Sequence, residues 1–488
     1  MRRPVFASLA LATLLAGCAI GPKYERPAAE LPAAYRDAPA QGIAVKGDRW
    51  WTLYGDSTLE KLVDEALGHN QDLALAAARV DEARALLQVA EAASLPAVDA
   101  TAQRDRTRSS ERSSTPLPPN VPLERNTYKA QFNASYELDL WGRLKSASTA
   151  ARAQLFASRA AQETVRIALT AQVAQSYFTL AALDGQVAAT KNTLALRERN
   201  LALQKVRSDA GLIAEFDLRQ IEAEVAAARA LSPALERDRS AQELALAVLL
   251  GRSPRAIMEG SIARGAESGE PPAPMVPSGL PSDLLLRRPD IVEAEQRLVA
   301  ANARIAEARA ALFPRIALTG YLGSESASLG NLFTGPARIW QLAFALAQPI
   351  FQGGRLSGEI EAVKARERQA LAQYQKALQE AFREVREALI RQDRSREIFE
   401  AESARVVALK EALRLAQIRY DNGRSSQLEM LDAERNLLQA ELNRIEALRA
   451  RRAAVADLVK ALGGGWTGLA GDAAGTTTPA NTGNLESR

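Results

Sequence analysis

Few residues in this chain of 488 are of the types that usually carry out chemistry. It has one histidine, His69, and one cysteine, Cys18. A pair this far apart matches no zinc-binding or Cys–His nucleophile pattern, and a single cysteine cannot form a disulfide within the chain. The sequence also lacks a Gly-x-Ser-x-Gly elbow, a phosphate loop and a dinucleotide fingerprint. We therefore expect no enzyme activity, no cofactor and no metal site.

Cys18 stands at the end of a segment that has the layout of a secretory signal. A basic start at residues 2–3 precedes an apolar run at 5–15, which is too short to span a membrane. The run ends in Leu-Ala-Gly-Cys, which resembles a bacterial lipobox; a plain signal peptide with a chance cysteine is the alternative. We expect residues 1–17 to be removed and acyl chains such as palmitate to anchor the protein through Cys18. Ala19, in place of Asp, favours the outer membrane.

Two carboxylates near a predicted helix turn are the other candidate functional groups. Glu429 and Asp432 are three residues apart, so they share one face of a helix. Carboxylates that gather in one place attract cations and repel one another when they are close. A solvated helix face is the alternative for each of them.

The charge pattern argues against a nucleic-acid partner. The chain has 62 basic and 58 acidic residues, which leave a net charge of +4. Charges of opposite sign alternate along the helical segments, as at 366–368, which is typical of a solvated helix face. A nucleic-acid binder would carry a basic stripe with interleaved aromatic residues, and we find none.

The chain is organised around a long helical stretch that occurs twice. The first copy is predicted over 143–210 and the second over 355–422; each begins at Gly-Arg-Leu and ends at Asp-x-Gly. A helix of this size is roughly 100 Å long, which exceeds an ordinary globular core. Apolar residues recur along it at steps of three, four and seven, as in a coiled coil. Gly211 and Gly423 are expected to turn the chain into return helices.

Each long helix follows a shorter helix and a β-hairpin in a duplicated unit. Repeat 1 is predicted over 57–250, with one helix to about residue 93 and a hairpin at about 97–140. Repeat 2 is predicted over 289–462, with a hairpin at about 315–351. The remaining segments are a proline-rich strap (18–56), a connector (251–288) and a tail (463–488) that we expect to be disordered.

The strongest strand signal indicates a membrane strand. From Tyr128 to Leu140, seven apolar residues alternate with polar ones, and aromatic residues lie near both ends, as in a membrane barrel. A soluble sandwich is the alternative, but it would need more strands. Four strands cannot close a barrel, because bacterial membrane barrels have about 8 or more. Copies of the chain must then share one, and a conduit needs three or more copies because about eight strands leave a filled interior.

Several stretches across the chain resemble one family. They are residues 18–27 (CAIGPKYERP), 50–51 with 56–59 (WW and DSTL), 279–285 (GLPSDLL), 287–291 (RRPDI) and 461–466 (ALGGGW). The sequence resembles the outer membrane factor family, the TolC-like channels of tripartite efflux systems, and within it the NodT- or OprM-like lipoproteins. The resemblance implies a mostly α-helical homotrimer with a twelve-stranded barrel, four strands per chain, continued by a coiled-coil tunnel across the periplasm. The channel would conduct drugs or other toxic compounds passively, and an RND-type inner-membrane pump, reached through a periplasmic adaptor, would power their efflux.

The resemblance also implies roles for residues at the helix turns. The implied periplasmic gate comprises Tyr420, Asp421, Glu429 and Asp432 in the second repeat and Asp217 in the first. In the implied trimer, three copies of Asp432 and Glu429 around the threefold axis would form a carboxylate ring that attracts cations and adds repulsion when it is narrow. The repeat offset aligns Asp432 with Gln220, which has no charge, so we expect repeat 2 to form the inner ring. The family often has an arginine near position 425; here Ser425 stands there beside Arg424, which puts that contact in doubt.

The adaptor is expected to dock on the two turns, at 207–212 and 419–424. The residues that we assign to this surface are Asp209, Gly211, Leu212, Gly423 and Arg424. Two other protein classes are considered as alternatives. A lipid-anchored periplasmic adaptor would have a single hairpin and flanking soluble β-domains, and a coiled-coil scaffold would leave the strand at 127–140 unexplained.

Overall fold

The computed structural model describes residues 21–28, 49–112, 114, 117–118, 120–265 and 288–466. They belong to two compact units. Unit 1 comprises Met1–Ala28, Arg79–Ser158 and Ala294–Gln375, and unit 2 comprises Ala29–Ala78, Arg159–Glu293 and Lys376–Arg488. The expected lipid site at Cys18 lies outside the described residues, as do 29–48, 266–287 and 467–488. No helix among the described residues is both long and apolar enough to cross a membrane.

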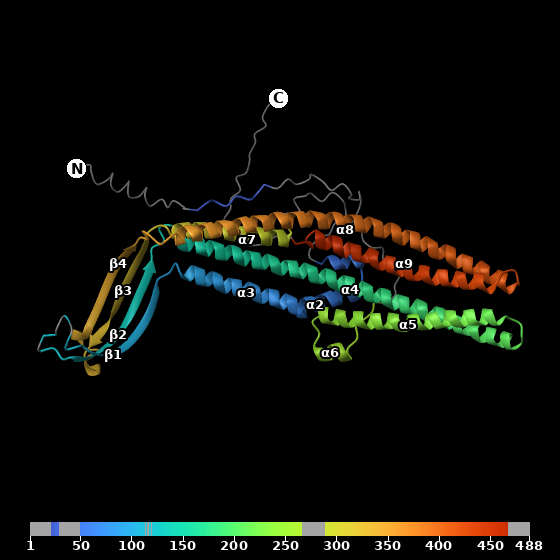
Figure 1. Ribbon diagram of the computed structural model, residues 1–488, viewed down its shortest axis with the longest axis horizontal. Helices are drawn as coiled ribbons and strands as arrows, with labels where there is room; N and C mark the ends of the chain where they lie inside the picture. Colours follow the sequence, from blue (N-terminus) through green and yellow to red (C-terminus); the bar gives the residue numbers. More distant parts are fainter. Residues whose placement is uncertain are drawn as a thin grey trace, which may run out of the picture. The chain divides into compact units, whose positions relative to one another are not determined.

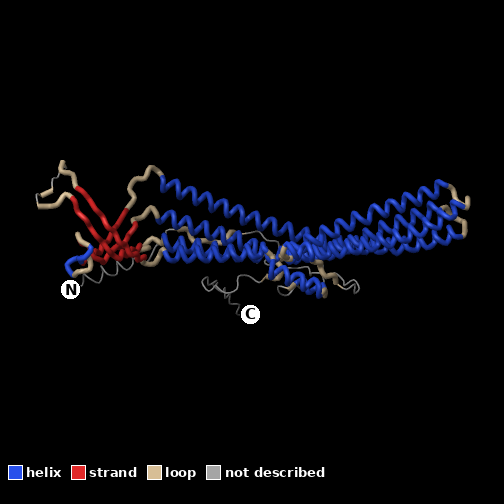
Figure 2. The backbone as a smooth tube through the Cα atoms, turned by 90° about the horizontal axis from the view of Figure 1, so that it is seen from below, coloured by secondary structure: helices blue, strands red, loops and turns tan. Residues whose placement is uncertain are grey.

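One antiparallel sheet forms the strand part of unit 1 (Figures 1 and 2). Its strands follow the chain in the order β1 (Ala97–Arg108), β2 (Glu124–Glu137), β3 (Arg315–Ser326) and β4 (Arg338–Ala347). Pairing of β2 with β3 joins the hairpins of the two repeats. Two short 3-10 helices, η3 (Leu329–Asn331) and η4 (Gly335–Ala337), occupy the loop between β3 and β4.

Strand β2 ends at Glu137, three residues before the predicted alternation ends. The amide of Leu138 still donates to the carbonyl of Ile316, but that of Leu140 donates to Leu138, so the chain has already turned. Gly142 then adopts a φ of 71° before α4, a conformation that glycine accepts without a steric cost.

The two faces of the sheet differ in character, because directly paired residues share a face. One row, for example, pairs Ala100 with Phe132, Phe132 with Leu322, and Leu322 with Trp340. In the isolated chain these large apolar side chains are exposed, with Trp340 at 76%. The opposite face carries polar residues such as Asp99, which accepts a hydrogen bond from Asn133. The predicted alternation therefore divides the sheet into an apolar face and a polar face.

Helices α3 (Gln71–Ala92) and α7 (Pro289–Ala310) run along the first parts of the two long helices in unit 1 (Figure 1). Alanine makes up much of the contact surface here. Ala150 and Ala153 of α4 pack against Ala300 of α7, and Leu155 packs with Val80 and Ala83 of α3. Small side chains let helices approach closely, at the lower end of ordinary interaxial distances.

Two helical hairpins make up most of unit 2. In the first, α4 (Arg143–Asp209), which belongs to unit 2 from Arg159 onward, pairs with α5 (Glu215–Leu249). In the second, α8 (Arg355–Asp421), which belongs to unit 2 from Lys376 onward, pairs with α9 (Gln427–Ala461). Figure 1 shows their turns in green and in orange. The long helices have 67 residues each. The unit also contains η1 (Trp50–Tyr54), α2 (Ser57–His69) and the short α6 (Pro254–Glu259). Helix α6 lies in the segment that the sequence indicated to be a connector.

The single helix predicted from residue 57 to about 93 is wrong, because the chain breaks at Asn70 into α2 and α3. Asn70 has a ψ of 131°, which is extended and not helical. Its Oδ1 accepts from the amides of Asp72 and Leu73, as an N-cap does. Its Nδ2 donates to the carbonyl of Leu249 at 2.9 Å. A contact 179 positions along the chain thus holds the break in place.

Candidate gate at the helix turns

Both helix turns have the same backbone design. Each uses a glycine in the left-handed conformation, Gly211 with φ 71° and Gly423 with φ 67°. In each, the residue after the glycine donates its amide to a carbonyl five positions earlier, Leu212 to Arg207 and Arg424 to Arg419, as in the Schellman motif. All five residues assigned to the docking surface, Asp209 among them, are exposed, and Leu212 is 73% exposed.

The two predicted gate carboxylates on α9 are each paired with a nearby arginine. Asp432 Oδ1 lies 2.8 Å from Arg435 Nη2, and Glu429 Oε2 lies 3.5 Å from Arg419 Nη2. Their side chains are 46% and 51% exposed, so each pair contributes at most about 1 kcal/mol. In one chain these carboxylates are therefore solvated groups beside cations.

Tyr420 is the predicted gate residue with the most connected environment. Its hydroxyl accepts a hydrogen bond from Gln204 Nε2 at 3.2 Å and donates one to Gln427 Oε1 at 3.1 Å. Because Gln204 belongs to α4 and Gln427 to α9, Tyr420 of α8 links the two hairpins. Gln204 is 1% exposed and Gln427 7% exposed. Tyr420 is among the gate residues predicted from the sequence, whereas neither glutamine is.

The other two predicted gate residues make local contacts. Asp421 accepts a hydrogen bond from Gln417 at 2.9 Å, one turn earlier on α8. Asp217 lies in the first turn of α5, where a carboxylate favours the positive end of the helix dipole. It is half-buried.

In the part of α4 that leads to the turn at Gly211, polar side chains are buried at positions where a coiled coil usually has apolar ones. Thr190, Arg197 and Gln204 follow one another at intervals of seven and are 0%, 5% and 1% exposed. We call these three residues the polar seam. Earlier on the same helix the predicted apolar seam is buried, for example at Val173 and Val187. The interval of seven was the only signal in the sequence that could have found the polar seam.

Arg197 is the charged centre of the polar seam. Its Nη1 lies 3.0 Å from Glu224 Oε2 of α5 and donates to the carbonyl of the same residue at 3.1 Å. Its Nε lies 3.7 Å from Glu434 Oε2 of α9. Within the described chain, Nε and Nη2 have no hydrogen-bond partner. Burial raises the pKa of the Glu434 carboxyl, and the Arg197 charge partly opposes that rise.

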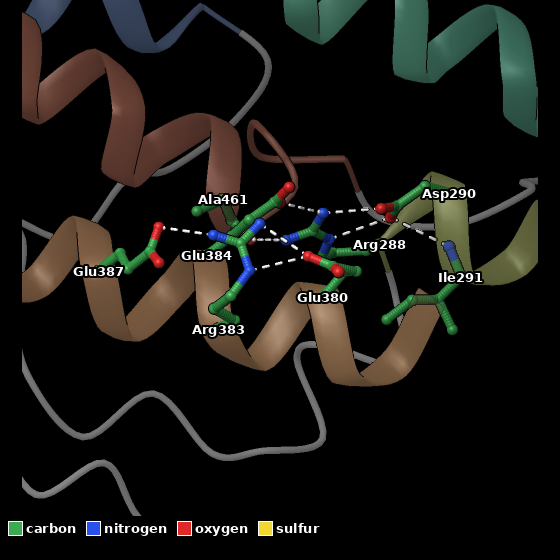
Figure 3. Close-up of polar contacts among 8 residues, drawn as sticks. All are labelled: Arg288, Asp290, Ile291, Glu380, Arg383, Glu384, Glu387 and Ala461. Carbon is green, nitrogen blue, oxygen red and sulfur yellow. Dashed lines mark hydrogen bonds and ion pairs between the residues drawn. The ribbon is translucent and has the colours of Figure 1, made fainter. Parts of the chain in front are cut away.

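A second buried arginine, Arg288, joins two of the stretches that carry the family resemblance (Figure 3). Its guanidinium donates to Asp290 at 2.7 Å, to Glu384 of α8 at 2.8 Å and to the carbonyl of Ala461 at 2.8 Å. The RRPDI and ALGGGW stretches therefore meet at one cation. A Cβ on Gly464 would lie 2.7 Å from the side chain of Ile167. The left-handed glycines at 463–465 allow this close approach. Residues 463–466, at the start of the segment 463–488 predicted to be disordered, are therefore packed within unit 2.

The strap stretch that follows Cys18 is held by a third cluster, in unit 1. Arg26 donates to both carboxylate oxygens of Glu295, at 2.6 and 2.7 Å, and Tyr24 Oη donates to Oε1 at 3.2 Å. The Glu295 side chain is only 8% exposed. Burial, followed by the Glu295 charge, raises the pKa of Tyr24. We call these three residues the strap clamp. Among the described residues, no group of three His, Cys, Asp or Glu side chains could hold a metal ion.

Comparisons with known proteins match most of the chain. The sequence family described as "Outer membrane efflux protein" matches residues 62–252 and 280–464. Outer membrane protein OprJ of Pseudomonas aeruginosa is 37% identical over 473 residues, covering 96% of this chain and 97% of its own length. Solvent efflux pump outer membrane protein SrpC of Pseudomonas putida is 36% identical, covering 95% and 98%.

Solved structures show the same fold. The CmeC outer membrane channel of Campylobacter jejuni superposes with a TM-score of 0.85 at 26% identity, covering 92% of this chain and 95% of its own. The open state of the MtrE outer membrane channel of Neisseria gonorrhoeae has a TM-score of 0.82 at 32% identity, covering 92% and 99%. The similarity thus includes both the sheet and the helical hairpins.

Proposed function

Because this chain belongs to the outer membrane efflux protein family and is a passive outer-membrane efflux channel, we propose how its copies assemble, which partner proteins it binds and which residues close the channel. It lies in the outer membrane and extends into the periplasm. Three chains form one twelve-stranded barrel, and the helical hairpins form the periplasmic tunnel. The turns at Gly211 and Gly423 form its periplasmic mouth.

The open sheet supports the trimer. Within the described residues, β1 pairs only with β2 and β4 only with β3, so each chain has two edge strands. In a bilayer every strand edge must be paired, because no water is present to satisfy the backbone groups. Two neighbouring copies can supply the missing partners, β4 of one chain beside β1 of the next, and three sets of four strands make twelve.

The partners are a periplasmic adaptor and an RND-type inner-membrane pump that exports drugs or other toxic compounds. The names of relatives support a pump, since one is called a solvent efflux pump outer membrane protein. The exposed turns support adaptor docking, because Leu212 and Phe216 are 73% and 69% exposed there. Exposed apolar side chains at a polar helix tip are typical of a protein-binding surface. Acyl chains on Cys18 add the membrane anchor, which mass spectrometry of the mature N-terminus would detect.

The gate is the set of contacts at the mouth, and the link through Tyr420 carries this proposal. Opening requires the α8–α9 hairpin to move away from α4–α5, and the hydrogen bond between Gln204 and Tyr420 opposes that movement. Asp432 and Glu429 then line the narrow end as a threefold carboxylate ring, which favours cations.

Planar-bilayer recordings of the purified protein test the function. Wild type should give discrete conductance and a trimer mass in detergent. Tyr420→Phe should open more often, and Asp432→Ala should lower cation preference. Glu411→Gln is the matched control, because Glu411 is an exposed carboxylate of α8 outside the proposed gate and pairs with Arg414 at 2.6 Å. A monomer without conductance would refute the channel, and unchanged gating and selectivity in both variants would refute the gate.

A further inference from the structure

One face of strand β1 changes from apolar to basic along its length. Because side chains alternate along a strand, Val98, Ala100 and Ala102 share a face with Arg104, Arg106 and Arg108. Residues at odd positions between them point to the other face, and none of these is an arginine or a lysine. The basic side chains of β1 are thus confined to the face of the sheet that bears its large apolar residues.

The strand register places a fourth arginine beside these three. Arg338 pairs with Ser324 of β3, Ser324 with Ala130 of β2, and Ala130 with Ala102 of β1. Arg338 therefore lies one step beyond Trp340 on the apolar face. We call Arg104, Arg106, Arg108 and Arg338 the arginine row.

The arginine row lies at the hairpin-loop end of the sheet. The opposite ends of the strands continue into helices α3, α4, α7 and α8, as Figures 1 and 2 show. Since the helices extend into the periplasm, the loop end lies on the outer side of the membrane. Arg104 is four residues beyond Ala100, the position level with Phe132 and Trp340, which is about 13 Å along the strand. At a tilt of about 45° this is roughly 9 Å along the membrane normal beyond the level of Trp340. Tryptophan collects at the membrane–water interface, so the arginines lie at the level of the headgroups.

The contacts of the row leave guanidinium groups available for a ligand. Arg106 and Arg108, about two-thirds exposed, share the carboxylate of Glu124 at 2.7 and 3.5 Å, and Arg108 Nη2 also lies 3.6 Å from Glu111 Oε1. The Arg104 guanidinium lies over the ring of Tyr128 at 5.5 Å, a contact that uses the face of the cation and not its N–H donors. Each guanidinium has five N–H donors, so these two carboxylates cannot satisfy the donors of four arginines. The row therefore has an excess of positive charge and of donors.

We propose that the arginine row binds the phosphate groups of phosphorylated glycolipids in the outer leaflet, lipid A in particular. Arginine forms paired hydrogen bonds with phosphate oxygens, and the adjoining apolar face accommodates the acyl chains of the same molecule. This continuity favours a lipid over a free anion, which has no apolar body. Since the proposal rests on the membrane position of the sheet, part of the function proposed above, its test must separate the two.

The test measures retention of lipid A by the purified full-length protein, using native mass spectrometry. The variant Arg104→Gln/Arg106→Gln/Arg108→Gln is compared with Arg125→Gln. Arg125 pairs with Thr107 at the same end of the sheet but on the opposite face, so it is the matched control. Near a charged membrane surface each arginine contributes roughly fivefold in binding. The triple variant should lose on the order of 100-fold, while Arg125→Gln should bind as wild type does.

Three probes distinguish the sources of phosphate. Wild type should retain bis-phosphorylated lipid A, should not retain dephosphorylated lipid A, and should show no competition from millimolar inorganic phosphate. Replacement of the three arginines by lysine should give retention between that of wild type and that of the triple glutamine variant, since the charge remains but the paired hydrogen bonds are lost. Equal retention by wild type and the triple glutamine variant, equal retention of dephosphorylated lipid, or displacement by inorganic phosphate would overturn the proposal. Bilayer conductance of the same samples tests the channel function separately, because the arginine row lies on the apolar, lipid-facing side of the sheet.

Discussion

Replacing Arg197 by methionine tests whether the polar seam couples the two hairpins. Methionine keeps much of the side-chain length but removes the cation that lies between Glu224 and Glu434. Their side chains are 25% and 22% exposed, against 5% for Arg197. Removing one partner of a buried ion pair costs about 3–5 kcal/mol. We expect the low end, about 3 kcal/mol, because the Glu434 contact is 3.7 Å long.

The effect should appear as faster local opening. Hydrogen–deuterium exchange of peptides covering residues 190–204 should speed up by roughly 100-fold. Arg229→Met is the matched control, because Arg229 of α5 pairs with Glu198 of α4 at 2.7 Å but is 62% exposed. Loss of this exposed ion pair should change the hydrogen–deuterium exchange rate by less than about fivefold. The double variant Arg197→Met/Glu434→Gln should recover part of the protection.

Acidification should reduce the difference in hydrogen–deuterium exchange rate between the Arg197→Met variant and wild type. Burial already raises the pKa of Glu434, and the Arg197 charge lowers it, so the variant has a still higher pKa at this position. A group whose pKa is raised on folding stabilises the folded state below its unfolded pKa and loses that contribution as pH rises through the folded pKa. The variant should therefore exchange more slowly near pH 5 than near pH 8, relative to wild type. Equal exchange in Arg197→Met and Arg229→Met, or no pH effect, would refute this reasoning.

Three further predictions concern the other buried contacts. Arg288→Met leaves partly buried carboxylates without their cation and should lower the melting temperature by roughly 5 °C, followed by circular dichroism; no change would contradict its linking role. Glu295→Gln weakens the strap clamp, so tryptic cleavage after Lys23 should be about tenfold faster, whereas an unchanged rate would show that other contacts hold the strap. Gly251→Ala should reduce the yield of folded protein, since its Cβ would lie 2.0 Å from a backbone carbonyl oxygen at φ +71°. Gly55→Ala, at φ +63° with open space, should cost only about 1 kcal/mol and is the comparison for yield.

Periodic features of the fold could be predicted from the sequence. The alternation that begins at Tyr128 identified β2, and the repeat offset identified two long helices, which have 67 residues each. Both signals arise from which face of an element is buried, and a local pattern records that directly. The glycines at the two turns were also readable, because a left-handed cap needs glycine at that position.

Features that depend on distant contacts could not be predicted. The break at Asn70 depends on a hydrogen bond to the Leu249 carbonyl, and asparagine within a helical pattern is otherwise unremarkable. Arg197 stands in an Arg-Glu-Arg run that resembles any solvated face, and only packing against α5 and α9 buries it. For the gate, sequence indicated Asp432 and Glu429, but their pairing with Arg435 and Arg419 requires the fold.

The open edges of the sheet have a consequence for how cells make this protein. A chain that contributes only a third of the strands of a closed barrel cannot complete the barrel alone. The rate of insertion should therefore depend steeply on the concentration of chains. One defective edge strand would then disable the barrel that it joins. With equal amounts of intact and edge-defective chains assembling at random, only about one barrel in eight would contain three intact copies. A defect in β1 or β4 should therefore be genetically dominant, whereas a defect in the strap clamp should affect only the chain that carries it.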